Sequence, residues 1–186
     1  MKENPIVMGI DDAMHQRATA KKTKLIGVVC QGTRMVGIVM DEIEIDGDDS
    51  TEALIRLIKR EERHVQYVIT DTITFGGFNI MDIARVHRET RKPIIAIIDR
   101  KVDMASVKRA LVKRFPETYE EKLKLIFHAG NLYQHEIKTA GGSSTVYFHA
   151  IGIDISEVGS LLDNISIDSK QPECTRMAHL IGRCYQ

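Results

Sequence analysis

Residues 65–71 read Val-Gln-Tyr-Val-Ile-Thr-Asp, a short apolar run that ends on the carboxylate of Asp71. Residues 6–11 read Ile-Val-Met-Gly-Ile-Asp and end in the same way on Asp11, and Ile-Ile-Ala-Ile-Ile at residues 94–98 is a third such run. Short continuous apolar runs of this kind are typical of buried strands. We therefore predict that these three segments are strands of one β-sheet.

The segments around these runs predict a mixed sheet. Two β-branched segments, 25–30 and 35–45, flank the turn 31–34, and with the first run they give three consecutive strands. Helical and apolar patterns then alternate, which favours parallel strands joined by right-handed connections. The predicted fold class is therefore α/β, an antiparallel three-strand meander extended by parallel strands and flanked by helices. The other expected elements are a loop over 13–24, a helix from Asp49, helices over 78–90, 103–114 and 117–130, a hairpin of 131–137 with 144–151, and a helix from Pro172.

The composition is that of a soluble globular protein, with 43% hydrophobic and 28% charged residues. The chain has 186 residues and no repeat or linker, so a single domain over residues 1–186 is expected. No apolar run approaches the roughly 18 residues that span a bilayer, and the first residues lack a secretory pattern. Three cysteines without CxxC spacing fit a reduced protein. We expect a cytoplasmic location and no membrane partner.

The formal charge is zero, from 26 Lys and Arg against 26 Asp and Glu, but the charges are unevenly distributed. Residues 41–52 carry seven acids and no base, so the rest of the chain has 26 bases against 19 acids. This basic surplus is compatible with a nucleic-acid partner, and it is equally compatible with ordinary solvated faces. A formal charge of zero therefore excludes neither a nucleic-acid partner nor an ordinary solvated surface.

Acidic side chains follow two of the predicted parallel strands. Asp11 and Asp71 each stand at a strand end, and Asp49 begins the intervening helix. Carboxyl ends of parallel strands meet at one edge of a sheet, where ligands usually bind. Carboxylate oxygens suit Mg²⁺ or Mn²⁺, so the three aspartates are candidate metal ligands and catalytic residues. The open alternative is local structure, with Asp49 as the N-cap of a capping box with Glu52 and Asp71 as the first residue of a loop turn.

Candidate substrate contacts lie close to these strand ends. The segment 75–79, Phe-Gly-Gly-Phe-Asn, offers backbone amides that could hold a phosphate, although a tight turn explains its glycines equally well. Arg100 and Lys101 follow the third apolar run and could contact phosphate, or they are solvated charges. Asn79, Arg100 and Lys101 are the candidate substrate-binding residues. The histidines, His179 among them, show no metal-ligand spacing, which favours core or surface roles.

Four motifs together resemble the endonuclease dU family, which is related to endonuclease V. They are Gly-Ile-Asp-Asp-Ala at 9–13, Ile-Asp-Gly at 45–47 with Asp49 and Thr51, Asp-Thr-Ile-Thr-Phe-Gly-Gly-Phe-Asn at 71–79 with Asp82, and Pro-Glu at 172–173 with Arg176, Ala178 and His179. The resemblance runs from about residue 6 to residue 182. It implies a ribonuclease-H-like fold and Mg²⁺-dependent cleavage of DNA near a deaminated base such as deoxyuridine.

Residue by residue, the resemblance implies that Asp11 and Asp71 match the first-strand and fourth-strand aspartates of endonuclease V. Asp49 falls near the place of its intervening glutamate, with Asp46 and Glu52 as alternatives. The chain also departs from the endonuclease V pattern. Thr72 replaces the glycine after the fourth strand, Asp99 stands where the catalytic lysine is expected, and no Pro-Tyr-Ile-Pro-like wedge precedes the first helix.

The leading hypothesis is a Mg²⁺-dependent or Mn²⁺-dependent endonuclease, a hydrolase of phosphodiester bonds that acts on deaminated DNA in repair. DNA is the expected partner, with RNA as an alternative. The runner-up is a non-catalytic nucleic-acid-binding protein that retains the fold, and the departures at Thr72 and Asp99 favour it. A third hypothesis is a phosphohydrolase of free nucleotides.

Overall fold

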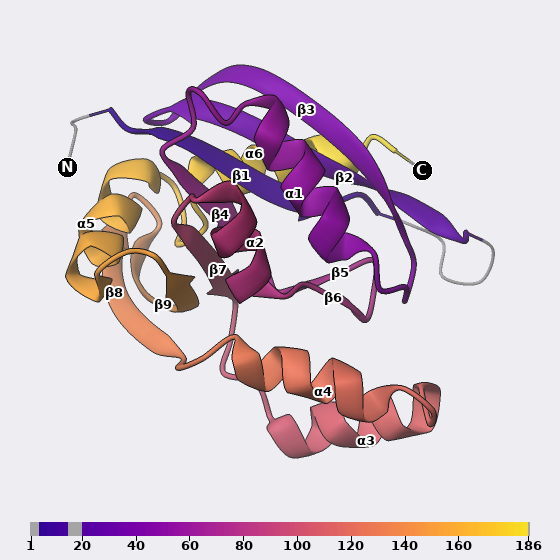
Figure 1. Cartoon of the computed structure of the whole chain (residues 1–186). Coiled ribbons are helices and arrows are strands. Elements are labelled where there is room, and N and C mark those ends of the chain that lie inside the picture. Colours follow the sequence, from indigo (N-terminus) through magenta and orange to yellow (C-terminus); the bar gives the residue numbers. More distant parts are fainter. Residues whose placement is uncertain (1–3, 15–19, 186) are drawn as a thin grey trace.

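The chain forms a seven-stranded mixed sheet with the strand order β3-β2-β1-β4-β7-β9-β8 (Figure 1). The structure is a computed structural model, and it describes residues 4–14 and 20–185. β1 pairs in parallel with β4 and β4 with β7, whereas β3-β2-β1 is an antiparallel meander, as predicted. The strands of this sheet are β1 (Ile6–Asp12), β2 (Lys22–Gln31), β3 (Arg34–Glu44), β4 (Tyr67–Thr70), β7 (Ile94–Ile98), β8 (Tyr133–Thr139) and β9 (Gly142–Ile151).

Helices cover both faces of this sheet. The covering helices are α1 (Ser50–Arg60), α2 (Ile83–Thr90), α5 (Ile155–Ile165) and α6 (Glu173–Gly182). The chain also forms α3 (Met104–Arg114) and α4 (Tyr119–His128). One core packs α1 and α2 against Met8 and Ile10 of β1, and the other packs α5 and α6 against Val7. Side chains alternate between the two faces of a strand, so Gly9 and Asp11 lie on the α6 face with Val7.

Gly9 allows α6 to lie directly on β1. A Cβ atom at this position would be 2.3 Å from the backbone carbon of Cys174 and 2.4 Å from the amide nitrogen of Thr175. Both are main-chain atoms of the first turn of α6, so no side-chain rotation can relieve the overlap. Only glycine therefore permits this spacing between helix and sheet.

We expect Gly9→Ala to lower the free energy of unfolding by at least about 2–3 kcal/mol, because α6 must move away from the sheet to admit the methyl group. Urea unfolding would measure the change. Gly37→Ala is the matched control, since its Cβ would meet only Val29 atoms at 3.7 Å or more. A Gly9→Ala protein as stable as the Gly37→Ala protein would contradict this account of the packing.

α3 and α4 form a pair that lies apart from the helices covering the sheet (Figure 1). Their connection to the body runs through the acidic segment 41–52. The buried Lys122 of α4 donates to Asp48 Oδ1 at 2.5 Å and to the carbonyl oxygens of Gly47 and Phe78 at 3.0 Å. Arg114 of α3 donates to Asp46 Oδ2 at 2.5 Å. Part of the acidic segment therefore holds this helix pair in place.

Several predicted elements differ from the observed ones. β2 begins at Lys22, inside the predicted loop, of which residues 15–19 lie outside the described residues. Residues 78–81 contribute to a small hairpin of β5 (Thr74–Phe75) and β6 (Asn79–Ile80), and α2 begins only after Asp82, whose side chain accepts from the Arg85 amide. α5 was not predicted. Within the described part of the chain, no helix is long and apolar enough to cross a membrane.

Candidate metal centre at the carboxyl edge of the sheet

The parallel pair β1 and β4 brings Asp11 and Asp71 together. Ile10 is in register with Thr70, and the Asp71 amide donates to the Ile10 carbonyl at 3.0 Å. Asp11 faces α6, as the alternation along β1 requires. Asp71 comes two residues after Ile69, which packs in the same core as α6. Both aspartates therefore lie at one edge of the sheet, as the sequence predicts.

Side chains from α6 and the segment before it contact both carboxylates. His179 Nδ1 lies at hydrogen-bond distance, 2.9 Å, from Asp11 Oδ2, and the Asp12 amide donates to Asp11 Oδ1 at 2.9 Å. The Gln171 amide nitrogen donates to Asp71 Oδ1 at 2.8 Å. Each contact leaves carboxylate oxygen lone pairs for a further ligand, because an ionised carboxylate has about four acceptor positions.

The two carboxyl groups share an environment that disfavours negative charge. Burial, and next the negative charges of Asp71 and Asp12, raise the pKa of Asp11 to about 7, and the hydrogen bond with His179 offsets part of this rise. Burial also raises the pKa of Asp71, which the Gln171 bond partly opposes. Among the described residues, no Lys or Arg forms an ion pair with either carboxylate. A cation at this edge would therefore relieve the repulsion between them.

The donor set fits a hard divalent ion. Asp11 and Asp71 supply oxygen ligands, and Mg²⁺ is commonly held by one or two carboxylates while it keeps several waters. No group of three or more His, Cys, Asp and Glu side chains converges to hold a metal ion in the part of the chain that the structure describes. Two carboxylates would leave the other positions of such an ion to water.

Asp49 lies apart from this pair. Its carboxylate accepts from the Glu44 amide at 3.1 Å and from the Asn79 side-chain amide at 2.6 Å. It occupies the N-cap position of α1, which packs on the opposite face of the sheet from α6. The structure thus brings together two of the three predicted metal ligands.

The predicted capping box is wrong, because Asp49 makes no side-chain bond to the first turn of α1. Asn79 supplies that cap instead: its side-chain oxygen accepts from the Ser50 amide at 2.9 Å, and its nitrogen also donates to the Glu44 carbonyl. Glu52 pairs with Arg85 rather than with the helix start. Asn79 is fully buried in these contacts, so it does not reach a surface where substrate would bind.

The amides of the segment 75–79 are also occupied within the protein. The Gly76 amide donates to Asp12 Oδ2 at 3.1 Å and the Phe78 amide to Asp46 Oδ1 at 2.9 Å. Gly76 and Gly77 have φ angles of 50° and 92°, which glycine adopts without strain. The tight-turn interpretation therefore holds, and these two amides bind carboxylates instead of phosphate.

Two cavities open beside Asp71. The smaller, about 240 Å³, is lined by Asp71, Asp99, Lys170, Gln171 and His179, with apolar atoms of Ile97, Ile98 and Val146. Lys170 Nζ donates to the Asp99 carbonyl at 2.6 Å and lies 2.9 Å from its Oδ1. Asp99 stands at the end of β7, where the endonuclease V pattern has a lysine. The structure brings the side chain of Lys170 to this place from the segment before α6.

The larger cavity, about 640 Å³, extends from Asp71 toward α3 and α4. Arg100 and Lys101 line it, so the structure places both predicted substrate-binding side chains in the same cavity as Asp71. The remaining lining is mostly apolar. It includes Phe78, Ile98, Val102, Met104, Val107, Ile126, Phe127 and Leu132.

Sequence reasoning missed three residues of this edge, His179, Gln171 and Lys170. His179 had one usable signal, since it ends the run with Arg176 and Ala178 that carries the family resemblance. Gln171 and Lys170 had none, because they are about one hundred residues from Asp71 in sequence and only the packing of α6 brings them near it.

The fold matches solved structures over nearly the whole chain. A crystal structure of a protein of unknown function from Archaeoglobus fulgidus has a TM-score of 0.82 and 32% identity, with 96% of each chain covered. Endonuclease V of Ciona intestinalis, in complex with a 24-mer DNA containing an inosine followed by a ribo-adenosine, has a TM-score of 0.59 and 11% identity, over 94% of this chain and 82% of that one. The protein therefore has the ribonuclease-H-like fold of endonuclease V.

Among proteins with this fold, the sequence comparison identifies one family. Residues 5–185 match the family model described as Endonuclease dU. A UPF0215 protein of Nanoarchaeum equitans is 35% identical over 185 residues, which is 98% of this chain and 89% of the relative. The chain belongs to the endonuclease dU family, and membership of this family supports a nuclease.

Proposed function

We propose that the protein is a divalent-metal-dependent endonuclease that cleaves DNA at or near a deaminated base such as deoxyuridine, as a step in DNA repair. The observation that carries the proposal is the adjacency of Asp11 and Asp71, two carboxylates that lie at the ends of neighbouring parallel strands and form no ion pair with a described Lys or Arg. Family membership supports the reaction class. The DNA bound to the Ciona neighbour supports nucleic acid as the partner.

In this proposal Asp11 and Asp71 hold Mg²⁺ or Mn²⁺. A bound ion would supply Lewis-acid chemistry, by lowering the pKa of water and by neutralising charge on the scissile phosphate. His179 fixes the orientation of the Asp11 carboxylate, and Gln171 does the same for Asp71. Arg100 and Lys101 attract the nucleic-acid backbone to the same edge. Asp49 as a third ligand remains a prediction, which Asp49→Asn would test.

The larger cavity supports a base that is turned out of the helix. Its 640 Å³ lies within the range of small-ligand sites, and its apolar wall adjoins Asp71. Enzymes that act at single bases commonly place the displaced base in a pocket between aromatic and apolar side chains. Phe78 and Phe127 could provide such a wall. The cavity would therefore recognise the lesion in a chain that has no Pro-Tyr-Ile-Pro-like wedge before its first helix.

We expect Phe127→Ala to reduce the preference for a deoxyuridine duplex over a matched thymidine duplex by about 10-fold, because a base–aromatic stacking contact is worth about 1–3 kcal/mol. Phe127 is 63% exposed, so its loss should leave the fold intact. Single-turnover rates on the two duplexes give the ratio. Val36→Ala, an exposed apolar position on β3, is the control. An unchanged ratio in Phe127→Ala would exclude this residue from recognition.

A nicking assay tests the proposal as a whole. The purified protein should nick a duplex with one deoxyuridine in the presence of Mg²⁺ or Mn²⁺, should spare the thymidine duplex, and should stop when the metal is chelated. Equal nicking of both duplexes would reject the lesion preference. Binding of both duplexes without nicking at any concentration of either metal would favour the runner-up, a non-catalytic nucleic-acid-binding protein, which Thr72 and Asp99 support.

A further inference from the structure

The basic surplus of the chain is concentrated in and before α3. Between Arg100 and Arg114 the sequence has one acid, Asp103, and six bases, in a chain whose formal charge is zero. The bases are Arg100, Lys101, Lys108, Arg109, Lys113 and Arg114. The charge that could attract a polyanion is therefore gathered in one short segment beside the candidate metal centre.

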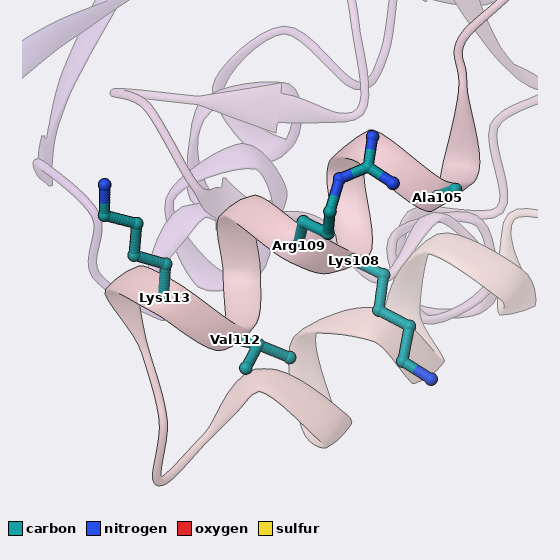
Figure 2. Close-up of a pocket in the computed structure, with 5 residues that line it drawn as sticks. All are labelled: Ala105, Lys108, Arg109, Val112 and Lys113. Carbon is teal, nitrogen blue, oxygen red and sulfur yellow. The ribbon is translucent and has the colours of Figure 1, made fainter.

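Three of these bases are free to bind an external partner. Lys108 and Lys113 are exposed and make no hydrogen bond or ion pair with any described residue, and Arg109 makes only a bond to Ser106 and a 3.8 Å contact with Asp103. Figure 2 shows these three side chains extending from α3. Together with Ala105 and Val112 they line a surface hollow of about 450 Å³. Arg114 differs, because Asp46 already holds it.

The packing of α3 leaves this face uncovered. Leu111 is the one buried residue that the described structure places in α3, and the helix packs against α4. Arg109 and Lys113 are four residues apart on the helix, where like charges repel. α3 itself carries no acidic residue, and Asp103 at its N-cap contacts Arg109 at 3.8 Å but makes no ion pair with Lys113 among the described residues. A bound polyanion would offset the repulsion between Arg109 and Lys113.

The start of α3 and the candidate metal centre line the same cavity. Arg100, Lys101, Met104 and Val107 line the larger cavity together with Asp71, so the start of α3 borders that centre. An α-helix rises 1.5 Å per residue, which gives the 11-residue α3 a length of about 16 Å. Base pairs are stacked about 3.4 Å apart along DNA, so α3 as a whole is as long as about five base steps, and its free basic side chains, from Lys108 to Lys113, span about two of them.

We propose that α3 binds the phosphate backbone of duplex DNA, several base steps from the bond that is cleaved, and holds the duplex in place without reading its sequence. This inference rests on the proposed function for the identity of the polyanion. Its partner is a duplex long enough to reach from the larger cavity to Lys113.

The test neutralises the three free bases together, in the variant Lys108→Gln/Arg109→Gln/Lys113→Gln. Fluorescence anisotropy measures its affinity for an undamaged 30-base-pair duplex in EDTA, between about 50 and 200 mM salt. We expect at least a 10-fold loss of affinity, and a slope of log K against log salt that is smaller by about 2–3, since each phosphate contact contributes about 0.9. Circular dichroism should match the wild type.

The control variant, Lys59→Gln/Arg63→Gln/Arg88→Gln, removes the same charge from exposed positions in and around α1 and α2. It should bind within about 2-fold of the wild type. Equal losses in both variants would show only a net-charge effect and overturn the proposal. An unchanged affinity and slope in the α3 variant would also overturn it and would point to another acidic partner.

Failure of this inference is separable from failure of the proposed function. The binding assay uses no lesion and no metal, so α3-dependent binding by a protein that never cleaves would keep the inference and reject the nuclease. With an active protein, the α3 variant should lose cleavage of a 30-base-pair deoxyuridine duplex. It should equal the wild type on a duplex too short to reach any of the three substituted residues, and a loss on both lengths would contradict the proposal.

Discussion

Asp71→Asn is expected to lower kcat/KM on a deoxyuridine-containing duplex by at least about 10³-fold, which corresponds to about 4 kcal/mol of transition-state stabilisation. The substitution removes one of the two carboxylates of the proposed metal centre and keeps the shape of the side chain. The Asn carbonyl can still accept the bond from Gln171, so the local structure should persist. Nicking rates under single-turnover conditions with Mg²⁺ measure the effect.

Asp154→Asn is the matched control for this loss of charge. Asp154 is exposed at the N-cap of α5 and makes no side-chain capping bond, so its replacement should leave the rate within about 2-fold of the wild type. An Asp71→Asn protein that retains a tenth or more of the wild-type rate would place the reaction elsewhere on the molecule.

Asp11→Asn is expected to stabilise the fold by roughly 2–4 kcal/mol at pH 8, because the substitution removes a charge that folding disfavours. Burial and the neighbouring Asp71 raise the pKa of Asp11 from 3.8 to about 7. A carboxyl group with a raised pKa binds its proton more tightly in the folded state, so wild-type stability falls as the pH rises from about 4 through 7. The gain in Asp11→Asn should therefore be absent near pH 4. Urea unfolding at pH 4 and pH 8 gives both values.

The same variant tests metal binding without a cleavage assay. An ion held by Asp11 and Asp71 stabilises the folded state by mass action, so Mg²⁺ or Mn²⁺ should raise the Tm of the wild type at pH 8. The shift should vanish in Asp11→Asn, while the shift in Asp154→Asn should be normal. An Asp11→Asn protein that gains no stability at pH 8, or that keeps the full metal-induced shift, contradicts the electrostatic account of this edge.

The strands of the sheet can be predicted from the sequence where the segment itself has a distinctive apolar pattern. β1, β4 and β7 are continuous apolar runs, and their parallel pairing follows from the helices that separate them. Other boundaries depend on tertiary contacts. Residues 78–81 have a helical pattern. In the structure the Asn79 side chain instead forms hydrogen bonds with Glu44, Asp49 and Ser50, and α2 starts only at Ile83. α5 does have an apolar stripe, at Val158, Leu161, Leu162 and Ile165, which the sequence interpretation overlooked.

The candidate site also has one part that the sequence predicts and another part that depends on tertiary packing. Asp11 and Asp71 were predictable, because the ends of adjacent parallel strands must meet. The partners His179, Gln171 and Lys170 depend on how closely α6 approaches β1, which Gly9 permits and no local pattern reports. The acidic segment 41–52 was interpreted partly as a source of ligands. In the structure Asp46 and Asp48 instead anchor α3 and α4, and Asp49 bonds to Asn79.

The most direct test of the central claim is the anomalous diffraction of crystals grown with Mn²⁺. We predict a manganese peak at ligand-bond distance from carboxylate oxygens of both Asp11 and Asp71, and its absence from crystals of the Asp71→Asn protein. A manganese ion bound only in the segment 46–49, or an empty Asp11–Asp71 edge at saturating Mn²⁺, would contradict the assignment of this edge as the metal centre.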